Sequence, residues 1–342
     1  MTSLSTPEAE SSTELMQAVW YDEKGLAEQV LQSGELPVPM PSPSEVRVQI
    51  RASGVNPSDA KSRGGFYTPP KVFSRTIPHS DGAGVIDRVG AGVNQTRIGE
   101  RVWIWNAQWK RAFGTAAQYV VLPAEQAVVL PNNVDFVVGA TLGVPALTAW
   151  RAVTIEGSVA GKTLFIAGGA GAVGHFAIQV AKAKGATVIT TVSSAEKAAH
   201  AHQAGADYIL NYRTESVVER VKEITDGKGV DLVVDVGIAA NASILPDIIA
   251  PHGTIVVYGT SATEVPLPIL RFIVDSVSIR FFIVYELQSI VRQAAISDLI
   301  NLLQTGVVTA VIGKHFPLTE IVEAHHAIET GKVIGNVVVD IQ

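Results

Sequence analysis

One pattern repeats from Gly161 to Val284: an apolar stretch of strand length is followed by a stretch of helix length, with glycines between them. The apolar stretches begin 21 to 24 residues apart, at Thr163, Thr187, Tyr208, Val230, Thr254 and Val277. A strand, a helix and two short loops need about that length, and such connections favour parallel strands joined by right-handed crossovers. The period therefore predicts six parallel strands with helices on both faces, a doubly wound α/β sheet of the Rossmann type.

The chain before this repeat has a different character. Glu45–Arg51 alternates polar and apolar residues with a period of two, as a half-buried strand does. Turn signals rich in glycine and proline separate further short strands, expected at Ala83–Val89, Arg101–Trp105, Ala116–Val121 and Ala127–Leu130. We therefore predict an antiparallel β domain.

The period stops near residue 286. Helical spacing returns in Gln288–Leu303 and from about Thr319 to Thr330, and a last strand is expected at Asn336–Ile341. Because nothing here extends the βα series, we expect the end of the chain to rejoin the first domain. The predicted organisation is a tail without structure at 1–15, a catalytic domain at 16–135 and 286–342, and a nucleotide-binding domain at 136–285.

Composition excludes several classes of protein. The chain has 47% apolar and 17% charged residues, unlike a disordered chain. It has no cysteine, which excludes disulfides, cysteine-bound zinc, iron–sulfur clusters and a thiol nucleophile. A net charge of −6 without a run of Lys and Arg argues against a nucleic-acid partner. Without an apolar run of membrane length or a signal peptide, we expect a cytoplasmic protein and no membrane partner.

The first βα unit carries the most informative motif, Gly169-x-Gly171-x-x-Gly174, between a strand and a helix. In such a motif the first glycine permits the tight turn, the second lets the backbone approach a pyrophosphate, and the third lets helix and strand pack closely. The alternative is a glycine turn with a purely structural role. Because the motif opens a six-strand series, we expect it to bind a dinucleotide through Gly169, Ala170, Gly171, Ala172, Val173 and Gly174.

The end of the second strand favours NADPH over NADH. NAD sites usually place a carboxylate about 20 residues after the glycines, and none stands there. Hydroxyl and cationic groups suited to a ribose 2′-phosphate are present instead, at Ser193, Ser194, Lys197, Tyr212 and Arg213. The alternative reading is that these are ordinary capping and surface residues.

With these motifs the chain resembles the medium-chain dehydrogenase/reductase superfamily, and within it the zinc-independent quinone oxidoreductases of the zeta-crystallin type. The matching stretches span nearly the whole chain: Gly54–Asp59, Ser80–Val85, Gly99–Val102, Pro145–Trp150, Ala170–Gly174 and Gly205–Asp207. The resemblance implies a GroES-like β domain, a Rossmann domain and an active site in the cleft between them. It also implies a homodimer formed through the sixth Rossmann strand, at about Val277–Val284.

Zinc divides this superfamily. Where its alcohol dehydrogenases have a zinc-binding His within Gly-His-Glu, this chain reads His79-Ser80-Asp81. His79 has no cysteine partners, so we interpret it as a loop histidine near the cleft and expect no metal. Side-chain donors must then stabilise charge that develops on a substrate oxygen.

The resemblance implies three catalytic candidates. Asn56 and Asp59 match an Asn-Pro-x-Asp pattern at the wall of the nicotinamide pocket, and Tyr67 has the spacing of a family tyrosine that can donate a proton. Tyr67 could equally be a packing residue. Family enzymes often have a tyrosine at the position of Lys61, so no role carries over to that residue.

Further residues are expected to contact the nicotinamide or the substrate. The resemblance maps nicotinamide contacts to Thr148, Gly259, the Phe281–Val284 strand with Phe282 and Val284, and Asn336. Trp103, Trp105 and Trp109 crowd one segment and could form an aromatic wall for a flat substrate. The alternative for Trp103 and Trp105 is one face of a strand packed in a core.

These observations favour an NADPH-dependent, metal-free reductase that transfers a hydride to a small-molecule quinone or α,β-unsaturated carbonyl. One alternative is an enoyl thioester reductase, which needs a longer acyl slot and basic residues for a coenzyme or carrier phosphate. The other is a crystallin-like protein that binds NADPH without turnover. Asn56, Asp59 and Tyr67 together favour the enzyme, since a pure binding protein needs none of them.

Overall fold

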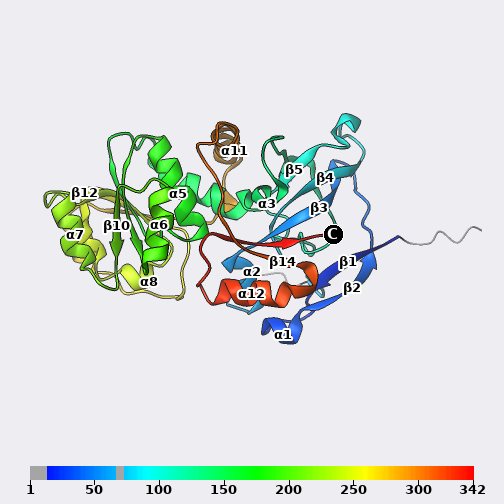
Figure 1. Ribbon diagram of the computed structural model, residues 1–342, viewed down its shortest axis with the longest axis horizontal. Coiled ribbons are helices and arrows are strands. Elements are labelled where there is room, and N and C mark those ends of the chain that lie inside the picture. Colours follow the sequence, from blue (N-terminus) through cyan, green and yellow to red (C-terminus); the bar gives the residue numbers. More distant parts are fainter. Residues whose placement is uncertain (1–13, 67–72) are drawn as a thin grey trace, which may run out of the picture.

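The computed structural model describes residues 14–66 and 73–342, which form two lobes lying side by side (Figure 1). One lobe is built on a six-stranded sheet and the other on a seven-stranded sheet with a separate strand pair. Tyr67 and residues 1–13, most of the predicted tail, lie outside the described residues. The prediction extends that tail to Leu15, whereas strand β1 (Leu15–Trp20) begins at this residue.

The six-stranded sheet is parallel throughout. Its strands in spatial order are β10 (Tyr208–Asn211), β9 (Thr187–Val192), β8 (Thr163–Ile166), β11 (Val230–Asp235), β12 (Ile249–Val257) and β13 (Ser278–Phe281). This order confirms the predicted doubly wound Rossmann sheet. The strand order reverses between β8 and β11, and ligands of such sheets bind outside the carboxyl ends of the strands at that point.

Two strands of this sheet differ from the predicted bounds. β12 starts at Ile249 rather than Thr254, because Ile249 pairs with Val230 before a register shift brings Thr254 opposite Leu232. β13 is confined to Ser278–Phe281, and a 3₁₀ turn (Val284–Glu286) replaces the expected end of the strand. The local sequence did not predict these bounds, since the first residues of β12 include Pro251, His252 and Gly253, which interrupt the apolar pattern.

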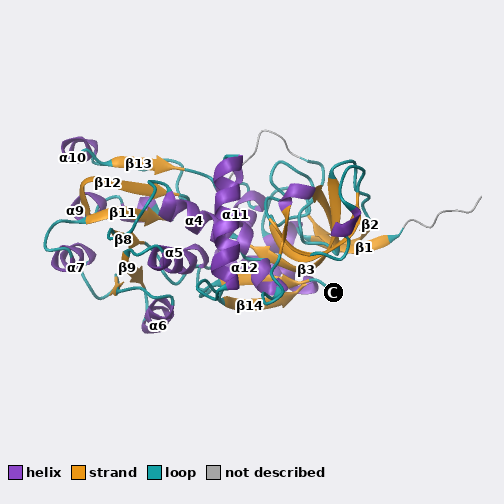
Figure 2. Cartoon of the chain, turned by 90° about the horizontal axis from the view of Figure 1, so that it is seen from above, coloured by secondary structure: helices purple, strands orange, loops and turns teal. Residues whose placement is uncertain are grey.

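Helices cover both faces of the parallel sheet (Figure 2). Leu164 and Ile166 of β8 point into one core with helix α5, and Phe165 between them points into the other. This alternation is why the strand is apolar on both faces. The helices of this lobe are α4 (Leu147–Thr154), α5 (Ala172–Ala183), α6 (Ala195–Gln203), α7 (Val217–Ile224), α8 (Ile238–Asn241), α9 (Leu245–Ile248) and α10 (Ile269–Val274).

The seven-stranded sheet includes the end of the chain, as predicted. Its main order is β14 (Ile312–Pro317), β15 (Asn336–Asp340), β3 (Glu45–Val55), β4 (Asp81–Val89), β5 (Arg101–Ile104) and β7 (Ala127–Val129), with β6 (Tyr119–Pro123) also paired to β3. The pairings are antiparallel except β14 with β15. Because β15 lies between β14 and β3, residues 312–340 form part of the GroES-like lobe.

The remaining elements surround this sheet or connect the lobes. They are strand β2 (Gln32–Pro37), paired with β1, and helices α1 (Ala27–Val30), α2 (Pro57–Arg63), α3 (Phe136–Gly139), α11 (Ser289–Gln304) and α12 (Ile321–Glu329), with short 3₁₀ turns at Gln95–Arg97, Ala124–Gln126 and Leu318–Glu320. α11 lies where the lobes meet (Figure 2), and its Asp298 accepts hydrogen bonds from Trp150 Nε1 and Lys184 Nζ. The proposed division of the chain at 135 and 285 stays a prediction. No described helix has the length and apolar content to cross a membrane.

Candidate active site

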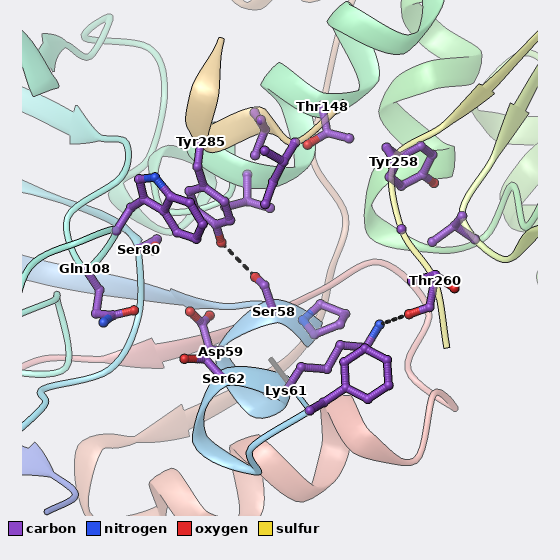
Figure 3. Close-up of a pocket in the computed structure, with 18 of the residues that line it drawn as sticks. Ser58, Asp59, Lys61, Ser62, Ser80, Gln108, Thr148, Tyr258, Thr260 and Tyr285 are labelled. Carbon is purple, nitrogen blue, oxygen red and sulfur yellow. Dashed lines mark hydrogen bonds between the residues drawn. The ribbon is translucent and has the colours of Figure 1, made fainter. Parts of the chain in front are cut away.

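A cavity of about 1100 Å³ lies between the two lobes, and both contribute to its wall (Figure 3). The GroES-like lobe contributes α2, the loop after β1 and the segment around Trp109. The Rossmann lobe contributes Thr148, Val173 and the ends of β12 and β13. The predicted contacts Gly259, Phe282 and Val284 also line it. The cavity is slightly larger than typical pockets for cofactors and drug-sized molecules, which measure roughly 300–1,000 Å³.

The glycine motif forms the turn from β8 into α5. A Cβ atom at Gly174 would lie 2.3 Å from the carbonyl oxygen of Gly168, and one at Gly169 would lie 2.3 Å from Thr190 Oγ1. These two glycines are therefore required for packing. At Gly171 the nearest atom to such a Cβ is the carbonyl oxygen of Gly168 at 3.4 Å, an ordinary contact, so the fold itself does not require glycine there. Gly171 caps α5 without a side-chain hydrogen bond, which leaves backbone N–H groups for an anion.

The residues predicted for a 2′-phosphate gather at one edge of the sheet. Ser193 and Ser194 follow β9, and Tyr212 and Arg213 follow the neighbouring strand β10, in which Asn211 pairs with Val192. The backbone N–H of Tyr212 donates to the carbonyl oxygen of Val192. The two strand ends are therefore adjacent, with Arg213 exposed.

Ser194 also has a structural role. Its Oγ accepts a hydrogen bond from the N–H of Lys197 and caps α6. An oxygen that accepts in this way still has its own O–H to donate. The capping interpretation and the phosphate interpretation of Ser194 are therefore compatible.

Asn336 contacts the glycine loop only through its neighbour. The N–H of Gly335 donates to the carbonyl oxygen of Ala170, whereas the Asn336 amide is buried and donates to the carbonyl oxygen of Val311. Asn336 does not line the cavity. Its side chain thus holds the start of β15, and the geometry gives no support to a direct nicotinamide contact.

Asn56 donates hydrogen bonds to two buried carboxyl groups, Asp59 and Asp81, of which Asp59 lines the cavity. The N–H of Asn56 donates to Asp59 Oδ2 at 2.8 Å, and Asn56 Nδ2 donates to Asp81 Oδ2 at 2.9 Å. Asn56 and Asp59 form a capping box that starts α2. Asp59 lines the cavity but Asn56 does not. Asn56, a catalytic candidate from the resemblance, therefore holds the two carboxyl groups in position and does not face the cavity.

Asp81 accepts a hydrogen bond from a π-helical turn that precedes α4. Residues Leu142–Ala146 form a π-helical turn whose Val144 N–H donates to Asp81 Oδ2 at 2.8 Å. A Cβ atom at Gly143 would lie 2.1 Å from Asp81 Oδ1, so glycine is required there. Burial raises the pKa of Asp81 well above its ordinary value. Among the described residues, Asp81 Oδ1 has no hydrogen-bond partner.

Asp59 is a cavity group whose pKa lies close to neutral pH. Burial raises its pKa to about 7, against the opposing effect of hydrogen bonds from Asn56 and from the backbone of Ser80. Desolvation disfavours the charged form of a carboxyl group. Asp59 can therefore gain or lose a proton near neutral pH within the cavity.

Tyr285 is a cavity residue that the sequence analysis missed. Its hydroxyl oxygen lies 2.8 Å from Ser58 Oγ of α2, across the cleft (Figure 3). Its ring stacks on Trp109, with ring centroids 4.5 Å apart and planes 9° apart. Burial raises the pKa of Tyr285 above its ordinary value, so the phenol is neutral and can donate a hydrogen bond. The nearest signal in the sequence was its position directly after the predicted strand Phe281–Val284.

The backbone of Tyr285 is held from behind the cavity. Arg292 of α11 and Asn106 both donate to its carbonyl oxygen, at 3.1 and 2.9 Å. The Arg292 guanidinium stacks on the Trp105 ring at 4.0 Å from the ring centroid. Buried groups with these bonds fix the orientation of the Tyr285 side chain.

The three tryptophans separate in the structure. Trp109 lines the cavity, whereas Trp103 is 1% exposed in the core and Trp105 packs behind the wall against Arg292. The aromatic-wall hypothesis is therefore wrong for Trp103 and Trp105. Trp103 lies on β5, where alternate residues point to opposite faces, and this one points into the core.

His79 lies away from the cavity. It is fully buried, with Nδ1 2.8 Å from Ser53 Oγ and Nε2 3.1 Å from His325 Nε2. Burial lowers the pKa of His79 to about 3, so it is neutral. In the part of the chain that the structure describes, no three His, Asp or Glu side chains converge as metal ligands would.

Comparison with known families assigns both lobes. Residues 42–132 match the sequence model of the alcohol dehydrogenase GroES-like domain. Residues 172–317 match the model named zinc-binding dehydrogenase. The two matches cover most of the GroES-like sheet and of the parallel sheet.

Curated relatives and solved structures cover nearly the whole chain. Quinone oxidoreductase of Pseudomonas aeruginosa is 34% identical over 87% of this chain and 91% of the relative, and quinone oxidoreductase 1 of Escherichia coli is 33% identical over 90% and 94%. The crystal structure of the Escherichia coli quinone oxidoreductase complexed with NADPH has a TM-score of 0.84 at 27% identity, covering 95% of this chain and all of that one. A crystal structure titled NAD-dependent alcohol dehydrogenase has a TM-score of 0.88 at 30% identity, covering 96% and 100%.

Proposed function

This chain belongs to the quinone oxidoreductase family of medium-chain dehydrogenases/reductases, and from that premise we propose that it is an NADPH-dependent reductase of quinones or α,β-unsaturated carbonyls that works without a metal. One observation carries the proposal: the predicted nicotinamide contacts Thr148 and Gly259 line the same cavity as the polar side chains of Ser58, Asp59 and Tyr285. Cofactor and proton-donating groups therefore face the same space.

The Rossmann lobe fits NADPH. Gly171, where the fold itself does not require glycine, and the uncapped N-terminus of α5 suit a pyrophosphate, and the adjacent ends of β9 and β10 offer Ser193 and Arg213 to a 2′-phosphate. The Escherichia coli relative was crystallised with NADPH, which supports the same cofactor here. When bound, NADPH supplies the hydride.

Side chains from both lobes stabilise the negative charge that develops on the acceptor. A carbonyl carbon or conjugated carbon that gains a hydride leaves negative charge on its oxygen, and a hydrogen-bond donor aimed at that oxygen lowers the barrier. The neutral Tyr285 phenol is such a donor, with Ser58 holding its oxygen. Asp59, with its pKa near neutrality, can return a proton to the cavity.

The proposal that the enzyme works without a metal is argued from the residues at the position of the zinc ligands. Ser80 stands where zinc-dependent relatives have a histidine ligand, and the chain has no cysteine. Ser80 lines the cavity, but a neutral hydroxyl is not among the usual zinc ligands. The phenol and hydroxyl donors take the role that a Lewis acid has elsewhere. Tyr67 stays a second candidate donor.

We also propose a homodimer formed through β13. This strand is an edge of the parallel sheet, and α10 beside it exposes the apolar residues Ile269, Leu270, Ile273 and Val274. An unpaired edge next to exposed apolar side chains favours association. Pairing of two copies of β13 would cover both features.

The proposed activity is tested by following NADPH or NADH absorbance with three acceptors: an ortho-quinone, a simple enone and a crotonyl thioester. We expect rapid oxidation of NADPH with the quinone or the enone, and slow oxidation of NADH. A preference for the thioester would indicate an enoyl thioester reductase instead. Tight NADPH binding with no oxidation by any acceptor would overturn the enzyme and leave a binding protein.

A further inference from the structure

Two lysine ammonium groups lie on the cavity wall of the GroES-like lobe. Lys61, on α2, reaches across the cleft and donates from Nζ to the carbonyl oxygen of Thr260 at 2.6 Å (Figure 3). Lys24, in the loop after β1, donates to the carbonyl oxygen of Ser62 at the end of the same helix. Both side chains are half-buried and line the cavity.

Neither ammonium group has a carboxylate partner in the described part of the chain. By contrast, Lys110 at the same cavity pairs with Glu286 at 2.6 Å. Of the carboxylates along the wall, Asp22 pairs with Arg75, Asp59 caps α2, and Glu23 is exposed at the rim. Lys61 and Lys24 therefore have no carboxylate counter-charge: their contacts are neutral oxygen atoms and the aromatic rings of Phe66 and Tyr21, respectively.

Such an arrangement is costly without a ligand. Burial lowers the pKa of both lysines, because their charged forms lose water and gain no counter-charge. An ammonium group has three N–H donors, and the Thr260 contact uses one of them. An anionic oxygen entering the cavity would supply the missing charge and accept the remaining hydrogen bonds.

The position of the lysines points to the acceptor rather than to the cofactor. Both belong to the lobe that carries Ser58 and Asp59, whereas the phosphate-binding features, Gly171 and Arg213, belong to the Rossmann lobe. Thr260, which Lys61 contacts, directly follows the predicted nicotinamide contact Gly259. An anion bound to Lys61 would therefore lie beside the predicted nicotinamide contact Gly259.

Building on the proposed function, we propose that the acceptor carries an anionic group, a carboxylate or a phosphate, which Lys61 and Lys24 bind in the cleft. The preferred substrates are then acidic quinones or enones, whose anionic group lies close to the reacting carbonyl. A neutral quinone or enone binds without this contact and is the poorer substrate.

Matched acceptors test the proposal with the full chain. The pairs are phenanthrenequinone and its carboxylate derivative, benzalacetone and its para-carboxylate, and crotonyl pantetheine and crotonyl coenzyme A. The variants are Lys61→Met, Lys24→Met and Lys61→Arg, with Lys110→Met as the control lysine that already has a partner. KM and kcat are measured for each pair, and the Kd of NADPH is measured separately by fluorescence titration.

We expect the charged member of at least one pair to have the lower KM. Lys61→Met should raise that KM roughly 10- to 100-fold, the contribution of a hydrogen bond to a charged group, and leave the neutral member within about threefold. Lys61→Arg should restore most of the preference and Lys110→Met should preserve it. A response of the quinone or enone pair supports the proposal, whereas a response of the coenzyme A pair alone would overturn it in favour of an enoyl thioester reductase.

Two results would overturn the proposal. Equal KM values within every pair would mean that the lysines bind no acceptor anion, while the reductase activity itself would stand. A rise in the Kd of NADPH with unchanged acceptor KM would assign Lys61 to the cofactor. Failure of all acceptors to oxidise NADPH would instead contradict the proposed function, so the two failures are distinguishable.

Discussion

The Tyr285 hydroxyl lies 2.8 Å from Ser58 Oγ although the two residues are 227 positions apart in the chain. Ser58 sits in the first turn of α2 in the GroES-like lobe, and Tyr285 follows β13 of the parallel sheet. The contact spans the cleft, so it joins the proton-donating groups of one lobe to the wall formed by the other. It defines where the oxygen of an acceptor can accept a hydrogen bond.

Tyr285→Phe should lower kcat roughly 10- to 100-fold with little change in KM for the acceptor, because the donor acts on charge that develops during reduction. The ring remains, so its stacking on Trp109 and the cavity shape are retained. The measurement is steady-state NADPH oxidation with the best acceptor. Tyr119→Phe, which loses a hydroxyl contact with Gln49 on β3, is the matched control and should be neutral.

Tyr67→Phe, assayed in parallel, separates the two candidate phenols. If Tyr285 is the donor, Tyr67→Phe leaves kcat unchanged. The opposite pattern, a loss with Tyr67→Phe alone, would remove Tyr285 from the chemistry and make it a wall residue.

Asp59 should give the protein a pH-dependent stability. Burial raises its pKa to about 7, so the folded chain binds a proton that the unfolded chain has released. The free energy of unfolding therefore falls as pH rises from about 4 to 7, by at most about 4 kcal/mol. In Asp59→Asn this fall should shrink, because the amide keeps the capping hydrogen bond but has no charge to bury. Burial also raises the pKa values of Asp81 and Asp235, and both contribute to the fall that remains.

Urea unfolding at pH 5 and pH 8 measures this difference. Asp22→Asn is the control that should leave this difference unchanged, since Arg75 lowers the pKa of Asp22 and its stabilising contribution is lost only as pH falls below about 4. An unchanged difference between the two pH values in Asp59→Asn would mean that Asp59 is charged throughout. The pH dependence of kcat, with an inflection near pH 7 in the wild type only, gives a second readout.

The sequence predicted what local chemistry determines. The first four βα strands start at the predicted residues, because each has a run of apolar residues and a glycine or capping signal beside it. The turn at Gly169–Gly174 followed from the same kind of signal. The start of β12 at Ile249 was missed, since it depends on a register shift against β11 that no local pattern records.

Contacts between distant segments explain the errors at the site. Asn56 looked catalytic by position, yet its amide donates to Asp81, 25 residues later. Trp103 and Trp109 look alike in the sequence, and only the fold decides that one faces the core and the other the cavity. Tyr285 had no motif around it, since its partners Ser58, Asn106 and Trp109 all come from the other lobe.

Arg213→Met should weaken the binding of NADPH and leave the binding of NADH nearly unchanged. Arg213 is exposed and follows β10, whose end pairs with the end of β9 that precedes Ser193 and Ser194. Its loss would remove a charge-assisted contact that only a 2′-phosphate can use. We expect the Kd of NADPH to rise roughly 10- to 100-fold and that of NADH to stay within about twofold. Arg220→Met on α7, where the arginine pairs with Glu215 and Glu223, is the control. Equal weakening of both cofactors would mean that Arg213 supports the fold of this loop.

Leu270→Glu combined with Ile273→Glu should produce a monomer. Both side chains lie exposed on α10 beside the edge strand β13, where carboxylates would face their own copies across the proposed interface. Sedimentation equilibrium gives the mass directly. Ile98→Glu, an exposed apolar residue of the GroES-like lobe, should leave the assembly unchanged. A wild-type chain that sediments as a monomer would contradict the proposed homodimer.

Two substitutions in the glycine loop should separate cofactor binding from stability. In Gly174→Ala the new methyl group would lie 2.3 Å from the carbonyl oxygen of Gly168, so α5 must move away from β8 and Tm should fall by several degrees.

In Gly171→Ala the nearest atom is 3.4 Å away and φ is −80°, which alanine adopts without strain. Its Tm should stay within about 2 °C of the wild type. The methyl group would nevertheless occupy the space through which a pyrophosphate approaches the backbone, and the Kd of NADPH should rise at least tenfold. Thermal unfolding and fluorescence titration measure the two effects, and unchanged NADPH binding by a stable Gly171→Ala variant would place the pyrophosphate elsewhere.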